Sequence, residues 1–546
     1  MSSLLALPNE ILEQIVVQCA YERSLVSISF LSQTCAALRN LIYDSSDTML
    51  WKEVYLSMLD YPWSTRNIIS KFLEMPTRND FDWKGKFIAA MLLRKELKGS
   101  NPQLLENLDA HMKMLSELAN IPLPVLPNTH LCTSSNAVWL DKLFINGFPE
   151  VLVHRLIGKS PTSISSDSDP PESQSLILSP EWEFNRGQRF YELFLKIGFR
   201  PYTPPNGLHA DAHINPGKQR ALARTVARHR VYNMLYPSRA RCWGPYLPYE
   251  SSSVDSNQPP EPHLLIPDYP FLSAARMVVE TDLRESLQVD PDEMSLFWDS
   301  GQVWPLFTYE FARRDIYELV HRIDGKINVG DEASTRGLDA LRMGSAPGFW
   351  GNKETREIWL RTSSDPENES SLIDGWDWAG VEGTWARAVC WMDYRELLYH
   401  SVRSLMQDQL NHNMRETCRI SPMTFRITGY SRVSPRSSTL MSSNDDKNED
   451  KLMDSLVYAL PIIHFSDDKP GIKSNRTIRG TARMIGDGVV RWSLISRDNI
   501  EEQDDWALEA IQIGGIGSAL GAVGMWTGVG HDRGDPLGPM WMWRVE

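Results

Sequence analysis

Cysteine is scarce in this sequence, and its spacing fits neither a disulfide framework nor a Cys-x-x-Cys site. The chain has 6 cysteines in 546 residues, spread thinly from end to end. Small secreted folds carry cysteines at a much higher density, whereas isolated reduced thiols are typical of the cytoplasm and nucleus. The start of the chain also lacks a basic region, and Glu10 and Glu13 interrupt its apolar run. We therefore expect a cytoplasmic or nuclear protein without a signal peptide.

The sequence has fewer basic residues than acidic residues. The 56 lysines and arginines face 70 aspartates and glutamates, which gives a formal net charge of -14. Nucleic acids and anionic membranes are bound by basic surfaces, so we expect no nucleic acid and no membrane as the main partner. A protein or a small neutral ligand fits this composition better.

Catalytic motifs are missing as well. The sequence has no Gly-x-Ser-x-Gly and no His-Glu-x-x-His, and no cysteine–histidine pairing stands out. We therefore expect a protein that is not an enzyme, with no cofactor and no metal. His209-x-Asp211-x-His213 places three possible zinc ligands on one side of an extended segment. The favoured interpretation is nevertheless a polar loop.

Long apolar runs are missing too, apart from one glycine-rich stretch at 511–529. Its Gly515-x-Gly517-x-x-x-Gly521 spacing is one residue too long for a dinucleotide-binding loop, and no Lys-Ser or Lys-Thr completes a phosphate loop. Gln512 and the preceding acidic residues argue against a membrane span. We predict two strands joined by a tight glycine bend at the corner of a barrel.

The start of the chain does contain three short helical patterns within residues 1–60. Pro8 suits the first helical position and Glu10 the first turn, and apolar residues then recur at helical spacing. A second helix is predicted from Leu25 to Leu41, and a third in "LWKEVYLSML", 50–59. A unit this small buries little core, so its apolar surface is more stable when a partner covers it.

This region resembles an F-box. The matching features are Leu7-Pro8 with the helix behind it, "LSQTCAALRNLI" at 31–42, and Leu50-Trp51. F-box proteins dock on the Skp adaptor, which links them to a cullin scaffold in SCF ubiquitin ligases. The resemblance therefore implies a substrate-recognition subunit that binds Skp and presents a target protein for ubiquitylation. The adaptor-facing residues that it implies are Leu4, Leu7, Pro8, Ile11, Leu12, Ile15, Leu31, Leu38 and Trp51.

The similarity continues beyond the first sixty or so residues. Segments such as "ARTVARHRVYNMLY" and "GVEGTWARAVCWMDYRELL" are similar to a large fungal family of F-box proteins. This wider resemblance implies a family-specific recognition domain after the F-box and implies no activity. It assigns no substrate-binding residue.

The pattern along the chain predicts an α+β protein. Its expected parts are an F-box at 1–60, a helical connector at 61–120, a mixed α/β region at 128–380 and an antiparallel β-barrel at 381–546. A proline-rich linker, 121–127, separates the second part from the third. Helices are predicted near 186–198, 217–236 and 268–288. Disordered loops are expected where serine, proline and acidic residues cluster, at 159–180, 250–263, 361–371 and 434–451.

The barrel is predicted because apolar residues alternate with a period of two from about Gly380 onward. A hairpin is expected with its turn at Gly486-Asp-Gly488. Gly383-Thr-Trp385 resembles the Gly-x-Trp step that opens calycin barrels. That resemblance implies that a basic residue of the last strand, Arg544, packs over the tryptophan.

Other interpretations remain open at this point. The chain is alternatively a calycin-like carrier or enzyme for a small ligand, with the first helix only as a partner handle; this predicts a deep apolar cavity. A third possibility is a protein that binds Skp but works outside the ligase. Arg220, Arg224 and Arg228 form a stripe at helical spacing, which is usually solvated or paired with acids but is also able to bind an acidic degron.

Overall fold

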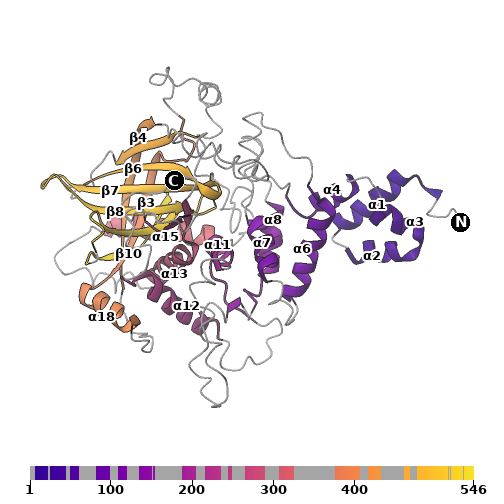
Figure 1. The fold of residues 1–546 in the computed structure, drawn as a ribbon, viewed down its shortest axis with the longest axis horizontal. Helices are drawn as coiled ribbons and strands as arrows, with labels where there is room; N and C mark the ends of the chain where they lie inside the picture. Colours follow the sequence, from indigo (N-terminus) through magenta and orange to yellow (C-terminus); the bar gives the residue numbers. More distant parts are fainter. Residues whose placement is uncertain are drawn as a thin grey trace, which may run out of the picture.

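A computed structural model shows helices at one end of the molecule and a β-barrel at the other (Figure 1). The residues that the structure describes are 6–22, 25–44, 49–60, 81–98, 108–119, 134–149, 152–153, 187–203, 215–234, 244–248, 265–288, 306–324, 376–405, 416–431, 460–467, 476–514, 516, 518–532 and 534–545. The loops expected at 159–180, 250–263, 361–371 and 434–451 lie outside these ranges. The predicted α+β class with a C-terminal barrel is confirmed.

The first helices are short. They are α1 (Asn9–Tyr21), α2 (Leu25–Thr34), α3 (Ala36–Arg39), the π-helical turn η2 (Asn40–Asp44) and α4 (Met49–Leu56). Pro8 precedes α1 as its N-cap, and its carbonyl accepts hydrogen bonds from the backbone of Ile11 and Leu12. The single helix predicted from Leu25 to Leu41 is wrong, because Cys35 adopts extended backbone angles and breaks it.

A helical region connects these helices to the barrel. It comprises α6 (Trp83–Lys98), α7 (Leu108–Ala119), α8 (Ser135–Leu143), α11 (Gly187–Ile197), α12 (Pro216–Val231), α13 (Tyr269–Ser286) and α15 (Leu306–Asp324). A short pair of strands, β1 (Tyr246–Pro248) and β2 (Leu265–Pro267), leads into α13. The predicted helices near 186–198, 217–236 and 268–288 are α11, α12 and α13. Among the described helices, none is both long and apolar enough to cross a bilayer.

Helix α13 is the centre of the helical region and lies against the barrel (Figure 1). It begins at Asp268, whose side chain accepts a hydrogen bond from the Phe271 backbone, and most of its residues are buried. Its neighbours include α11, α12, α15 and the strands β9 and β10. Arg276 of α13 has only 2% of its surface exposed.

Arg276 joins three elements through one guanidinium group. Its Nη1 donates to the carbonyl oxygens of Leu195 and Lys196 at the end of α11, and its Nε donates to Glu280 at 3.1 Å. The guanidinium also lies 5.4 Å from the ring centre of Trp541 in the last barrel strand. The arginine therefore satisfies helix-end carbonyls that have no partner within α11 itself.

The barrel is closed by eight antiparallel strands in the order β10-β3-β4-β5-β6-β7-β8-β9. Apart from β10, which closes on β3, each strand pairs with the next along the chain, as in an up-and-down barrel. The strands are β3 (Gly383–Met392), β4 (Glu416–Ser431), β5 (Ile462–Asp467), β6 (Arg476–Ile485), β7 (Val489–Asp498), β8 (Gln503–Gln512), β9 (Ala522–Gly528) and β10 (Leu537–Arg544). Helix α18 (Tyr394–Leu405) follows β3.

Four aromatic rings fill the part of the barrel where β3 begins. Trp385, Phe425, Phe465 and Trp492 come from four strands and contact one another in a closed cycle. Their ring centres lie 6.3 Å, 4.8 Å, 5.4 Å and 5.0 Å apart in that order around the cycle. Buried tilted and edge-on pairs of this kind contribute beyond the area that they bury. Arg544 pairs with Trp385 in the strand register, and its Nε lies 3.0 Å from where a Cβ of Gly383 would be.

The glycine-rich stretch forms the bend between β8 and β9, as predicted. Gly514 and Gly521 flank it with φ angles of 90° and 75°, a region that favours glycine. A Cβ on Gly521 would lie 2.0 Å from the Met542 carbonyl oxygen, so no other residue fits the observed backbone. The predicted hairpin at Gly486–Gly488 is also present, between β6 and β7.

The ion pairs of Glu280 predict how stability depends on pH. Burial would raise the pKa of Glu280, but the guanidinium groups of Arg284 and Arg276 outweigh it and lower the pKa below its ordinary value of 4.5. The carboxylate therefore stabilises the fold above that value, and this contribution is lost as the pH falls toward the folded-state pKa. Glu280→Gln should be less stable than the wild type at neutral pH, and the difference should shrink between about pH 5 and pH 3.

Urea unfolding at each pH measures this difference. The matched control is Glu318→Gln, since Glu318 forms the same i,i+4 pair with Arg314 on an exposed surface. The control should change the free energy of unfolding by less than about 1 kcal/mol at any pH. A deficit of Glu280→Gln that stays constant down to acid pH would contradict the assignment.

Candidate functional site

Helix α1 exposes part of the apolar stripe that the sequence analysis singled out. Leu7 is 40% exposed and Ile11 is 47% exposed, and Pro8 between them is exposed as well. Ile15, one turn further on, is half-buried. Leu4 lies outside the described residues. Large apolar side chains left in solvent at the start of a short helix are the kind of surface that a partner helix or groove covers.

Helix α2 adds two exposed apolar residues that the sequence analysis missed. Val26 and Phe30 are each 63% exposed, and their i,i+4 spacing places them on one face of the helix. Leu31, which was predicted to face the adaptor, is half-buried. The available signal was composition: residues 25–31 carry more apolar side chains than one helix face is able to bury. We call Leu7, Pro8, Ile11, Val26 and Phe30 the N-terminal apolar set.

Three of the predicted docking residues instead point into the chain's own core. Leu12, Leu38 and Trp51 are 6%, 5% and 8% exposed. Trp51 donates its indole N–H to the carbonyl oxygen of Ile42 at 2.7 Å, which fixes α4 against the π-helical turn. Because consecutive helix residues point about 100° apart, Ile11 faces solvent while Leu12 packs inward. The adaptor contacts implied for these three residues stay a prediction.

The N-terminal apolar set lies far from the barrel. Figure 1 shows α1, α2 and α3 at the end of the molecule opposite the barrel, with α6, α7 and α8 between them. At the other end of α1, Gln18 donates a hydrogen bond to Glu22 at 3.0 Å, and Tyr21 is 58% exposed. A partner bound at this end would leave the barrel surface open to a second molecule.

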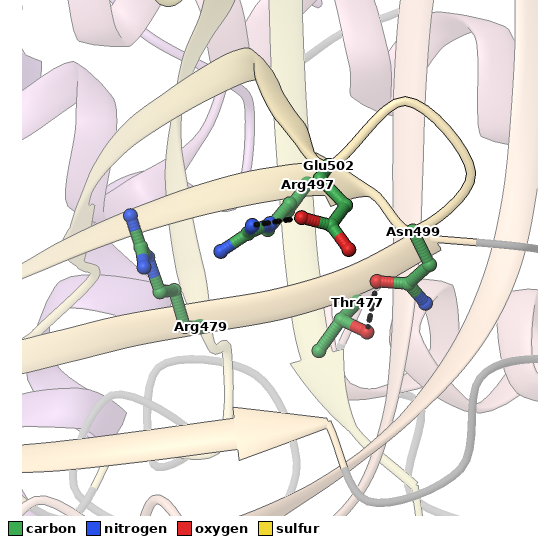
Figure 2. Close-up of a pocket in the computed structure, with 5 residues that line it drawn as sticks. All are labelled: Thr477, Arg479, Arg497, Asn499 and Glu502. Carbon is green, nitrogen blue, oxygen red and sulfur yellow. Dashed lines mark hydrogen bonds and ion pairs between the residues drawn. The ribbon is translucent and has the colours of Figure 1, made fainter.

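A hollow of about 380 Å³ opens on the outer surface of the barrel (Figure 2). It is lined by Thr477, Arg479, Arg497, Asn499 and Glu502. Its charges are already paired, since Arg479 donates to Asp504 at 2.7 Å and Arg497 lies 4.0 Å from Glu502. The Thr477 hydroxyl donates to Asn499 at 2.9 Å. A hollow with internally balanced charges offers little to a charged ligand.

Inside the barrel, Arg387 is a charged group with few partners among the described residues. Two residues beyond Trp385 on β3, it faces the same side of the strand. Its Nη2 lies 3.4 Å from the Ser421 hydroxyl, and its Nε is buried without a hydrogen-bond partner in the described part of the chain. Burial and the nearby Arg419 lower the pKa of Arg387 to about 10, against the opposing effect of Asp467. An anionic group would find an incompletely compensated cation here.

The arginine stripe of α12 is paired with acids within the molecule. Arg228 pairs with Glu416 of β4, and Arg224 pairs with Asp282 and, at 2.6 Å, with Glu285 of α13. Burial and the neighbouring Asp282 carboxylate raise the pKa of Glu416 to about 9. Arg220 alone of the stripe is exposed. The acid-paired interpretation is therefore confirmed for Arg224 and Arg228, and these two do not form a surface for an acidic degron.

The metal candidate from the sequence, His209-x-Asp211-x-His213, lies outside the described residues.

Comparison of the chain with protein-family models, with curated proteins and with solved structures found no match. Function is therefore argued from the placement of the residues alone.

The contrast between Ile11 and Leu12 predicts opposite outcomes for neighbouring substitutions. Ile11→Asp places a charge in solvent and should change the free energy of unfolding by less than about 0.5 kcal/mol. Leu12→Asp buries an unpaired carboxylate and should cost about 4 kcal/mol or more. Chemical denaturation of both variants measures the difference. Equal destabilisation would show that the Ile11 side of α1 is covered by the chain itself.

Proposed function

We propose that the chain is the substrate-recognition subunit of an SCF-type ubiquitin ligase. In this proposal α1 and α2 dock on the Skp adaptor, which connects to the cullin scaffold, and the barrel region binds a target protein. The observation that carries the proposal is the N-terminal apolar set, whose exposed residues include Leu7, Pro8 and Ile11 of the F-box-like pattern. In this proposal the chain binds its partners and catalyses no reaction itself.

The mechanism is tethering. A target held by the barrel region and a ubiquitin-conjugating enzyme held by the scaffold would meet at a high effective concentration, because both belong to one assembly. The separation of the first helices from the barrel supports this arrangement, since the two surfaces are free to be occupied together (Figure 1). The barrel and α13 share a buried core, which gives the target a preorganised surface.

A second candidate function is the binding of a small molecule inside the barrel. The observation that favours it is Arg387, whose Nε is buried and lacks a partner among the described residues. The four-ring cluster around Trp385 counts against a deep apolar cavity where β3 begins, because side chains fill that region. A ligand of this class would carry an anionic group. Native mass spectrometry of the purified protein would detect it as an added mass that Arg387→Ala removes.

Docking through the N-terminal apolar set predicts a specific loss of binding. The double variant Leu7→Asp, Ile11→Asp should bind a purified Skp–cullin complex at least about 100-fold more weakly, because two exposed anchors become charged. The matched control is Ile500→Asp, since Ile500 is 72% exposed at the barrel end of the molecule. Isothermal titration calorimetry measures all three affinities.

The control should bind like the wild type, and circular dichroism should show all three proteins folded. Wild-type affinity in the double variant, or no binding by the wild type, would contradict the docking proposal. A second measurement distinguishes a ligase subunit from a protein that binds Skp but works outside the ligase. If the chain acts as a ligase subunit, the ubiquitin conjugates that accumulate on proteasome inhibition should decrease in the Leu7→Asp, Ile11→Asp variant. If it works outside the ligase, the amount of these conjugates should be the same in the variant and the wild type.

A further inference from the structure

Two cysteines and two carboxylates meet where α13 packs on the outer surface of the barrel. Cys390 of β3 and Cys418 of β4 are directly opposite in the strand register, and both are free thiols. One ligand atom each of Asp282, Cys390 and Cys418 lies within 4.8 Å of the other two. Glu416 precedes Cys418 by two residues on the same strand, so both side chains face the same side.

Each carboxylate has one oxygen held by an arginine. Arg224 donates to Oδ1 of Asp282, and Arg228 donates to Oε1 of Glu416. Asp282 is only 9% exposed, and 1% of the Glu416 side chain is exposed. Their other oxygens, Oδ2 and Oε2, are buried, and the two carboxyl groups face each other at hydrogen-bonding distance, so that one proton is shared between them when no cation is bound. Two buried carboxyl groups in contact cannot both ionise without a cation between them, which points to a cation that is bound there.

The chemistry of this donor set matches zinc. Two sulfurs and one Asp282 oxygen supply three donors that lie together, and the Glu416 carboxyl that faces Asp282 is placed to supply a fourth. Zinc binds both donor types in a tetrahedral arrangement. Ligand atoms around such an ion lie roughly 3.3–3.8 Å apart, which the 4.8 Å limit includes. The arginines would fix the orientation of the carboxylates, as outer partners of metal ligands commonly do.

The charges balance as well. Two thiolates and two carboxylates carry four negative charges, and a divalent ion together with Arg224 and Arg228 carries four positive charges. Without the ion, two carboxyl groups face each other in a buried site. Binding would release the thiol protons and the proton held by the carboxyl pair to solvent and form two metal–sulfur bonds, with no change of oxidation state.

We propose that Asp282, Cys390, Glu416 and Cys418 form a structural zinc site that fastens α13 to the barrel strands β3 and β4. The site differs from the docking surface and from the barrel interior. Asp282, Cys390 and Cys418 come from segments far apart in the sequence, so no short spacing motif marks the site.

Metal analysis of the full chain tests the proposal. Protein purified from cells grown with added zinc, then dialysed against metal-free buffer, should contain about one zinc ion per chain by mass spectrometry. The double variant Cys390→Ser, Cys418→Ser should lose at least about nine-tenths of that zinc. The matched control is Cys35→Ser, a half-buried free thiol in the first helices, which should keep it.

A wild-type chain without zinc, or a double variant that keeps it, would overturn the proposal. If the double variant fails to fold, cobalt substitution of the wild type decides instead. Cobalt bound at this site should show tetrahedral visible bands and a thiolate-to-cobalt charge-transfer band in the near ultraviolet. X-ray absorption of the zinc form should show two sulfur and two oxygen neighbours. Absence of the charge-transfer band, or sulfur-free coordination, would equally overturn the site.

Discussion

The buried guanidinium of Arg276 is the interaction on which the architecture depends most. It caps the end of α11, pairs with Glu280 on its own helix and lies over Trp541 of the strand that closes the barrel. Arg284, two turns further along α13, binds both carboxylate oxygens of Asp324 at 2.9 Å and 2.6 Å and so holds α15 in place. α15 in turn contacts the barrel, since Arg322 donates to the carbonyl oxygen of Arg544 at 3.0 Å. Charged groups in a low-dielectric interior require such complete partnering.

These contacts make the helical region and the barrel parts of one packed core. The buried apolar cluster runs from Val16 in α1 through α13 to Trp543 in β10. The apolar residues that stay outside this core at the N-terminal end are therefore informative, because the same molecule buries comparable side chains a few residues away. Ile11 and Leu12 are neighbours in sequence, yet only Leu12 is buried. That contrast is the physical reason for assigning the exposed residues to a partner.

The fold was predictable where local periodicity agrees with the final packing. The alternation of Trp385 with small residues predicts β3, and the glycine bend at Gly514–Gly521 was expected from close backbone approach alone. The break at Cys35 was not predictable, because no helix-breaking residue stands there. Val26 and Phe30 were missed for a similar reason: a helix that is apolar on several sides does not reveal which side is buried. Cys390, Cys418 and Asp282 come together only through strand register and helix placement, which no sequence spacing encodes.

The central claim is that the exposed residues of α1 and α2 are covered by an adaptor subunit. A photoreactive amino acid placed at Ile11, at Phe30 and, as the reference position, at Ile500 tests this most directly in a mixture with purified Skp. The account predicts cross-links to Skp from Ile11 and Phe30 and none from Ile500. Cross-links from neither helix position, or equal cross-linking from Ile500, would contradict it.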